Sequence, residues 1–189
     1  MPPSVVSIPF GKNRPLYTEK ALFKVKGSLT LNGETMTADE NTTAIIDDHR
    51  GYYPRKMHYD WVTTMGLTDQ GYMGVNLTRN QSVDQEQYNE NLIWKEDGNS
   101  LLPPVHFSRT PESRDFSGSG EWHVRDDHHM VHVDFVVRNQ IAMIIRAGIV
   151  TADYHVSFGE MRGWVRKEDG TKIVLDGMMG MGEDKSMLF

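Results

Sequence analysis

The sequence contains no cysteine among its 189 residues. Disulfide bridges, thiolate zinc sites and cysteine nucleophiles are therefore excluded. Long apolar runs are missing too, and the opening residues MPPSVVSIPF lack the basic flank and apolar stretch of a signal peptide. We therefore expect a cytoplasmic protein with no membrane span, whose length suits one domain with its own core.

Basic residues are also in short supply. The chain has 20 Lys and Arg against 26 Asp and Glu, which gives a formal net charge of −6. Attraction between basic side chains and phosphates dominates nucleic-acid affinity, so this balance argues against nucleic acid and anionic membranes as partners. The partners that we expect are a small molecule of unknown identity and a second copy of the chain in a homodimer.

Helical periodicity is scarce, whereas turn signals recur along the whole chain. Type I′ turns need positive φ, which Asn-Gly and Asp-Gly tolerate best, and alternating segments flank most of these signals. The short acidic stretch 83–89 is the main helical candidate. The hairpin turns that we predict lie at Asn32-Gly33, Asp69-Gln70-Gly71, Asp97-Gly98, Asp127-His128 and Asp169-Gly170.

The turn at Asp127-His128 predicts a hairpin with one apolar and one polar face. Across a two-residue loop, Trp122 falls opposite Val133, and His123 falls opposite His132 on the other face. A strand with a single buried side shows this alternation.

These features predict an all-β fold of about ten strands with little helix. An antiparallel up-and-down meander of that length closes on itself to remove its edges, which favours a lipocalin-like (calycin) barrel. We expect residues 1–18 to form an N-terminal extension, residues 19–189 to form a single barrel domain and residues 110–120 to form a loop. A ligand inside such a barrel needs a cavity of roughly 300 Å³ or more.

The densest polar cluster is the run DDHRGYY, which begins at Asp47. An aspartate that faces an apolar barrel has a raised pKa and suits a general acid, whereas pairing with Arg50 lowers its pKa. An ion pair at a strand end is the structural alternative. Because Ile45 and Ile46 are adjacent and break the alternation, the pattern leaves open whether Asp47 or Asp48 faces inward.

Further candidates extend this cluster along the chain. The catalytic candidates are Asp47, His58 and Glu90. Aromatic side chains on an inward face serve either as core or as pocket wall, and buried amides orient ligands or satisfy turns. The ligand-binding candidates are His49, Arg50, Tyr52, Tyr59, Asp60, Trp61, Asn76, Asn91 and Trp94.

The histidine-rich hairpin raises the question of a metal site. His123, His132 and Asp134 carry competent zinc ligands, but their face lies opposite the apolar one and offers no closed surroundings. We therefore expect no metal and no cofactor.

Several runs resemble a known family: DDHRGYYPRKMHYDWVTTMG, GVNLTRNQS, YNENLIW, LLPPVHF and DGMMGMGEDK. They look like the C-terminal half of the bacterial family called domain of unknown function 2804. That family is distantly similar to lipocalin-like carotenoid hydratases, whose acid would fall on Asp47, within a pattern of Asp, three residues and Gly. The His and Trp that accompany this acid in the hydratases have no counterpart between Leu16 and Leu31.

Three functions therefore stay open. The first is the binding of a small, partly apolar molecule in a barrel pocket. The second is a cofactor-independent lyase or isomerase, similar to the hydratases, that uses Asp47 as general acid. The third is a structural or interaction domain that pairs with a missing N-terminal half or with a second copy, so the sequence leaves open whether the protein is an enzyme.

Overall fold

The computed structural model describes residues 1–114 and 119–189. Within them, all regular structure is β-strand except one short 3-10 helix, η1 (Pro111–Arg114). The strands are β1 (Ser4–Pro9), β2 (Pro15–Lys24), β3 (Ser28–Leu31), β4 (Glu34–Thr37), β5 (Thr43–Gly51), β6 (Lys56–Thr68), β7 (Gly71–Arg79), β8 (Leu92–Lys95), β9 (Ser100–Leu101), β10 (His106–Arg109), β11 (Glu121–Arg125), β12 (Val131–Ala147), β13 (Val150–Arg166), β14 (Lys172–Val174) and β15 (Met179–Leu188).

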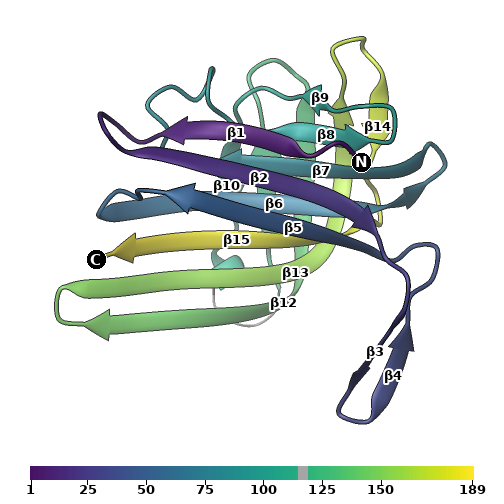
Figure 1. Ribbon diagram of the computed structural model, residues 1–189, viewed down its shortest axis with the longest axis horizontal. Coiled ribbons are helices and arrows are strands. Elements are labelled where there is room, and N and C mark those ends of the chain that lie inside the picture. The colour runs from purple at the N-terminus through teal and green to yellow at the C-terminus, as the bar shows by residue number, and fades with distance from the viewer. Residues whose placement is uncertain (115–118) are drawn as a thin grey trace.

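The largest sheet curls into a half-barrel (Figure 1). Its order is β10-β11-β12-β13-β15-β6-β7-β8-β9, with β14 paired to β13, and every pairing is antiparallel. The sheet thus consists of two meanders, β6 to β9 and β10 to β13, and β15 lies between β13 and β6 and joins them. The predicted all-β, barrel-like class is confirmed, although the end strands β9 and β10 are not hydrogen-bonded to each other.

Large side chains fill the interior of this half-barrel. Trp122 and Phe135 are fully buried there, with their rings 5.6 Å apart in an edge-to-face contact. Gly182 makes room for both, since a Cβ at this position would lie 2.9 Å from each ring. The rest of the core is mostly aliphatic, with Phe107 as a further aromatic side chain. Around Val62, Leu77 and Met161 the side chains leave no room for a water molecule, so this part of the interior does not hold the cavity that we expected.

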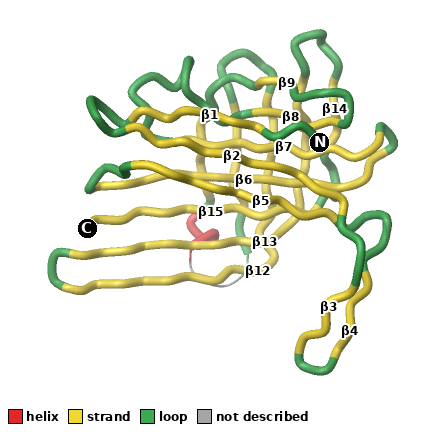
Figure 2. The backbone as a smooth tube through the Cα atoms, in the orientation of Figure 1, coloured by secondary structure: helices red, strands yellow, loops and turns green. Residues whose placement is uncertain are grey.

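A second, three-stranded sheet of order β1-β2-β5 packs against the outer face of β6, β7 and β8 (Figure 2). Alternation in β2 explains the contact, because the even-numbered residues from Leu16 to Leu22 are all buried. Leu22 packs on Leu92 and Trp94, and its methyl group would lie 2.8 Å from a Cβ at Gly74. Residues 1–18, expected as an extension, therefore contain β1 and the start of β2.

The predicted hairpins form, with differences in detail. Asn32 and Gly33 both have positive φ, 51° and 85°, and connect β3 to β4. The hairpins at Asp69, Asp97 and Asp169 connect β6 to β7, β8 to β9 and β13 to β14.

The register predicted for the β11–β12 hairpin was wrong by two residues. Trp122 pairs with Phe135, and His123 pairs with Asp134. The loop is longer than predicted because the Asp126 carboxylate accepts hydrogen bonds from the backbone N–H groups of two loop residues, His128 and Met130, and of Val131 at the start of β12.

Two further expectations concern irregular segments. The helix predicted for 83–89 is wrong, since these residues form turns in which Tyr88 N–H donates to the Asp84 carbonyl. Of the loop predicted for 110–120, residues 111–114 form η1, while residues 115–118 lie outside the described residues.

Strands β12 and β13 form a hairpin with 17 residues in each strand, much longer than the other hairpins. Its distal part projects beyond the barrel and exposes apolar side chains, including Ile141, Ile144 and Ile149 at 64%, 48% and 73% of their surface. In the part of the chain that the structure describes, no helix has the length and apolar character needed to cross a membrane.

Candidate functional site

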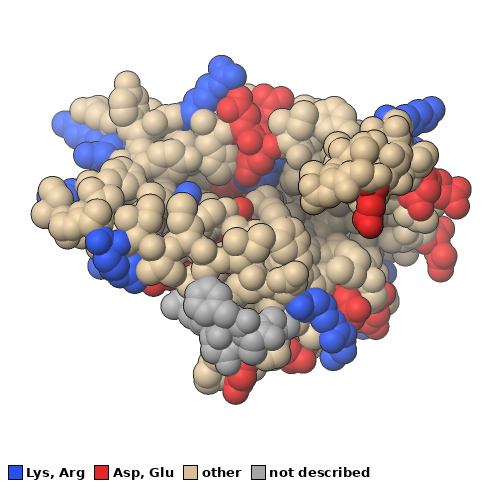
Figure 3. All heavy atoms as spheres, turned by 90° about the horizontal axis from the view of Figure 1, so that it is seen from below, with Lys and Arg blue, Asp and Glu red and all other residues tan. Residues whose placement is uncertain are grey.

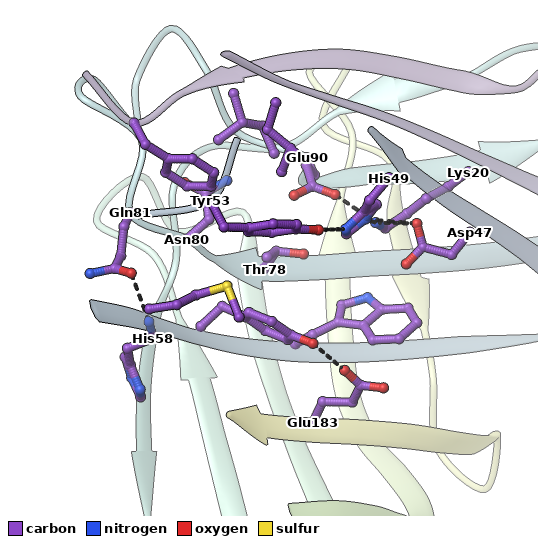
Figure 4. Close-up of a pocket in the computed structure, with 16 residues that line it drawn as sticks. Lys20, Asp47, His49, Tyr53, His58, Thr78, Asn80, Gln81, Glu90 and Glu183 are labelled. Carbon is purple, nitrogen blue, oxygen red and sulfur yellow. Dashed lines mark hydrogen bonds and ion pairs between the residues drawn. The ribbon is translucent and has the colours of Figure 1, made fainter. Parts of the chain in front are cut away.

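An aromatic-walled cavity lies between the two sheets, outside the barrel (Figure 4). Its volume is about 50 Å³, enough for several water molecules but well below the roughly 300 Å³ of a typical ligand pocket. An open groove of about 460 Å³ adjoins it and shares Met57 and His58 with its wall. The 16 lining residues are Ile8, Phe10, Leu16, Lys20, Asp47, His49, Tyr53, Met57, His58, Tyr59, Trp61, Thr78, Asn80, Gln81, Glu90 and Glu183.

A buried lysine organises the polar end of the cavity. Lys20 on β2 lies directly opposite Asp47 on β5, and its side chain is 5% exposed. The Nζ atom is 2.9 Å from Asp47 Oδ1, 2.7 Å from Glu90 Oε2 and 3.2 Å from Thr18 Oγ1. His49 Nε2 also lies 3.1 Å away, so the ammonium group has four polar neighbours for its three hydrogens.

His49 and Tyr53 extend this network toward the cavity. His49 Nε2 is 2.9 Å from Asp47 Oδ1, and His49 Nδ1 is 3.0 Å from the Tyr53 hydroxyl. With the ring proton on Nε2, His49 donates to Asp47 and accepts from Tyr53, which satisfies both ring nitrogens.

Electrostatics fix the protonation of these groups. Burial opposes the ionisation of Asp47, but the hydrogen bond from His49 and the positive charge of Lys20 outweigh it and lower the pKa of Asp47. Burial raises the pKa of Tyr53, and the negative charges of Asp47 and Glu90 raise it further. At neutral pH the network therefore contains an ionised Asp47 and a neutral Tyr53.

Gly51 fixes the strand register that builds this network. It pairs with Leu16 at the end of the β2–β5 ladder, where a Cβ would lie 2.3 Å from the Pro15 carbonyl oxygen and 2.6 Å from Leu16 Cα. Only glycine permits this approach, and the same ladder places Lys20 opposite Asp47. The pattern of Asp, three residues and Gly thus has a structural reason in this chain.

The opposite wall carries a third carboxylate, that of Glu183 on β15. Its oxygens accept hydrogen bonds from the hydroxyls of Tyr59, at 2.7 Å, and Tyr154, at 2.6 Å. Burial and the negative charge of Glu183 raise the pKa values of both tyrosines well above the usual range. Next to them, Trp61 Nε1 donates to Asn76 Oδ1 at 2.6 Å, which holds the indole in place as part of the wall.

A second buried charge cluster lies on the other face of β6, inside the barrel. Asp60 is fully buried and forms ion pairs with Arg79 and, at 2.5 Å, with Arg109. Burial works against its ionisation, but a hydrogen bond with His58 and the two arginine charges lower the pKa of Asp60 to about 2. Arg109 also lies 4.0 Å from the Trp122 ring centroid, so this cluster is part of the packed interior.

Groups that could ligate a metal also occur in this cluster. One ligand atom from each of His58, Asp60 and Asp184 lies within 4.8 Å of the others. The guanidinium groups of Arg79 and Arg109 already neutralise Asp60, so the donor set does not call for a cation. On the β11–β12 hairpin, His123 and Arg125 both contact Asp134 Oδ1.

The structure brings together six of the predicted site residues and separates the others. The residues that line the cavity are Asp47, His49, His58, Tyr59, Trp61 and Glu90. Asp47, and not Asp48, faces inward; Asp48 pairs with Arg50 in solvent. The predicted residues outside the cavity lining are Arg50, Tyr52, Asp60, Asn76, Asn91 and Trp94.

Each of these six residues has a structural position instead. Arg50 and Tyr52 are exposed, and Asp60 belongs to the barrel interior. The amides are buried behind the cavity wall: Asn76 holds Trp61 and the Glu90 carbonyl, and Asn91 Oδ1 accepts from Thr78 N–H. Trp94 is fully buried against Leu22.

Sequence reasoning missed Lys20, Tyr53 and Glu183. Alternation in β2 contained a usable signal, because Lys20 falls on the same face as Leu16, Thr18 and Leu22. A lysine within such a face requires a buried partner.

A comparison with known families matches residues 2–189 to the domain of unknown function DUF2804. The match spans nearly the whole chain, which therefore belongs to this family. Searches among curated proteins and among solved structures found no match.

Proposed function

We propose that this member of the DUF2804 family binds a small, partly apolar molecule in the cavity between its two sheets. The observation that supports this proposal is a partly open space with aromatic and aliphatic walls and a preorganised polar network at one end. Such a combination is typical of ligand sites, where a few polar groups orient a largely apolar ligand.

The size of the cavity constrains the ligand. A volume of about 50 Å³ admits a small head group, and the adjoining groove has room for an apolar extension past Met57 and His58. Among the described strands, the β1-β2-β5 sheet and the barrel are joined by side-chain packing and ion pairs such as Lys20–Glu90 and not by a hydrogen-bonded ladder.

Titration with 1-butanol, followed through the indole N–H signal of Trp61 by NMR, tests this proposal. We expect a saturable shift, because this N–H lies in the cavity wall and donates to Asn76. Ile8→Phe fills the cavity and should abolish the shift, whereas Val5→Phe, on the exposed face of the same strand, should preserve it. A Trp61 signal that does not respond, or that responds equally in Ile8→Phe, would overturn the proposal.

General-acid catalysis by Asp47 receives less support from this geometry. A general acid must be protonated near working pH, and Lys20 and His49 favour the ionised carboxylate. The lyase or isomerase alternative would therefore need Asp47 as a base or another residue as the acid.

An interaction function has its own supporting observation. Residues 141–147 of β12 form an open sheet edge that pairs only with β13 among the described residues. Figure 3 looks at the molecule from the side of β12 and shows mostly uncharged surface there. Natural edge strands are normally protected by lysine, proline or bulges, and this segment has Arg146 as its one charged residue.

We therefore propose a second copy of the chain as the partner of this edge. In an antiparallel pairing centred on Met143, Arg146 lies opposite Gln140, so no like charges face each other. Light scattering should show a dimer, Met143→Lys should be monomeric, and Ile149→Lys, in the turn, should remain dimeric. A wild-type chain that is monomeric at high concentration would contradict this assignment.

Three finer assignments remain proposals. The two meanders joined by β15 support a lipocalin-like relationship. The quoted sequence runs support a correspondence to the C-terminal half of longer family members, and the composition supports a cytoplasmic location.

A further inference from the structure

Hydrogen-bonding capacity is unevenly distributed around the cavity between the sheets. Its lining contains three carboxylates, those of Asp47, Glu90 and Glu183, and one ammonium, that of Lys20. With neutral histidines, the lining therefore has two more negative than positive charges. A ligand that enters this space meets an excess of acceptors and of negative potential.

Lys20 is not available to an incoming anion. Its Nζ atom already contacts Asp47, Glu90, Thr18 and His49 Nε2, at 2.9, 2.7, 3.2 and 3.1 Å. An anionic ligand would have to displace one of these partners, and it would leave a buried carboxylate without its counter-charge.

The carboxylates, in contrast, keep unused acceptor positions. Among the described residues, the side-chain contacts of Glu90 are made through Oε2, and Oε1 remains without one. Each Glu183 oxygen accepts one tyrosine hydroxyl, although a carboxylate oxygen can accept two hydrogen bonds. Both groups belong to the cavity wall and can accept from a ligand without losing a partner.

The aromatic side chains of the lining suit the same class of ligand. Phe10, Tyr53, Tyr59 and Trp61 contribute rings to the cavity wall (Figure 4). Lys20 Nζ lies 5.5 Å from the Trp61 ring centroid, so one cation is already paired with an aromatic ring of this wall. Aromatic rings together with carboxylates are the usual surroundings of bound ammonium groups.

We infer that the ligand of this cavity is a small organic cation, an ammonium group with an apolar substituent. This inference rests on the proposed binding function and adds the chemical class of the ligand. The ammonium donates to Glu183 and lies against the aromatic wall, and the substituent extends into the groove beside Met57 and His58.

A matched series of n-butylammonium, 1-butanol and butyrate separates charge from size. We expect n-butylammonium to shift the Trp61 indole signal with an affinity about tenfold higher than that of 1-butanol, as hydrogen bonds to charged groups imply. Butyrate should bind most weakly. Glu183→Gln should reduce the preference for the ammonium over 1-butanol about tenfold.

Two control variants separate charge from folding. Tyr154→Phe removes one hydrogen bond to Glu183 but keeps its charge, and Glu160→Gln removes a carboxylate that pairs with Arg138 outside the cavity lining. Both should retain the ammonium preference. If 1-butanol or butyrate binds as tightly as n-butylammonium, the inference of a cationic ligand is wrong, although the proposed binding function survives. If none of the three compounds shifts the Trp61 signal, both proposals fail.

Discussion

Two buried charge clusters lie on opposite faces of β6, and they are built with opposite signs. Inside the barrel, the anion Asp60 lies between the cations Arg79 and Arg109. Between the sheets, the cation Lys20 lies between the anions Asp47 and Glu90. The first cluster is enclosed by packed side chains, whereas the second lines a cavity and keeps unused acceptors.

This difference shows how to separate structural from functional buried charges. Ion pairing and perturbed pKa values occur in both clusters and do not discriminate between them. The discriminating feature is the empty space beside the lysine cluster. The comparison can be tested through stability, because a structural cluster should contribute more to folding than a cluster that is arranged for a ligand.

Among the variants compared, Asp60→Ala should cause the largest loss of stability. It removes the carboxylate shared by Arg79 and Arg109 and leaves Arg109 with the more distant Asp184, 3.7 Å from its Nε, so we expect the free energy of unfolding to fall by about 3–5 kcal/mol. Urea denaturation monitored by tryptophan fluorescence measures this change. Asp127→Ala, whose side chain is 82% exposed, provides the control and should leave stability nearly unchanged. A small effect of Asp60→Ala on the free energy of unfolding would show that the Asp60 cluster is not primarily structural.

Lowering the pH should also measure the contribution of the Asp60 carboxyl group to stability. The pKa of Asp60 is about 2 in the folded protein and about 3.9 in an unfolded chain. A lowered folded pKa stabilises the protein above the unfolded value, and this contribution is lost as pH falls through the folded value. We therefore expect Asp60 to contribute about 2–3 kcal/mol that declines between about pH 4 and pH 2. Urea titrations of wild type and Asp60→Asn across this range should converge; parallel curves would contradict the assignment.

Lys20→Met should destabilise the protein less than Asp60→Ala does. It leaves Asp47 and Glu90 without their shared cation, but the cavity admits water to them, so we expect a loss of about 1–3 kcal/mol at neutral pH. Lowering the pH toward about 4 should partly restore stability, because protonation relieves the repulsion between the two carboxylates. A loss as large as that of Asp60→Ala would show that both clusters are primarily structural.

Asp48→Asn should have the smallest effect of the series. Asp48 adjoins Asp47 in the sequence but faces solvent, where it pairs with Arg50 at 2.8 Å. We expect no measurable change in unfolding and none in the Trp61 indole signal, since exposed ion pairs contribute little. A shifted Trp61 signal would extend the cavity network beyond the residues described above.

The sequence predicted the hairpins well wherever a turn had its own chemistry. Asn32-Gly33 and Asp169-Gly170 specify positive φ locally, and the strands around them follow. The long β12–β13 hairpin was missed, because its turn at Gly148-Ile149 lacks such a signal and its distal strands expose apolar residues on both faces.

The sequence predicted only part of the candidate site, and the reason is physical. Asp47 and Trp61 belong to dense polar and aromatic runs, which stand out in the sequence. Their location outside the barrel could not be predicted, because β6 and β7 are buried on both faces near Thr63 and Asn76 and show no alternation of polar and apolar residues. Glu183 was missed because its partners, Tyr59 and Tyr154, are 124 and 29 residues away in the chain.

The position of β15 determines when the site can form during synthesis. Every other strand of both sheets precedes β15 in the chain, yet it pairs with β6 and β13 and supplies Glu183 to the cavity wall. A ribosome-bound chain can therefore form the two meanders and the β1-β2-β5 sheet early, but it must keep the edges of β6 and β13 unpaired until the last strand emerges. Pairings over such long sequence separations form slowly, and open edges are prone to association. Ligand binding and protection from aggregation should thus be acquired in the same late folding step.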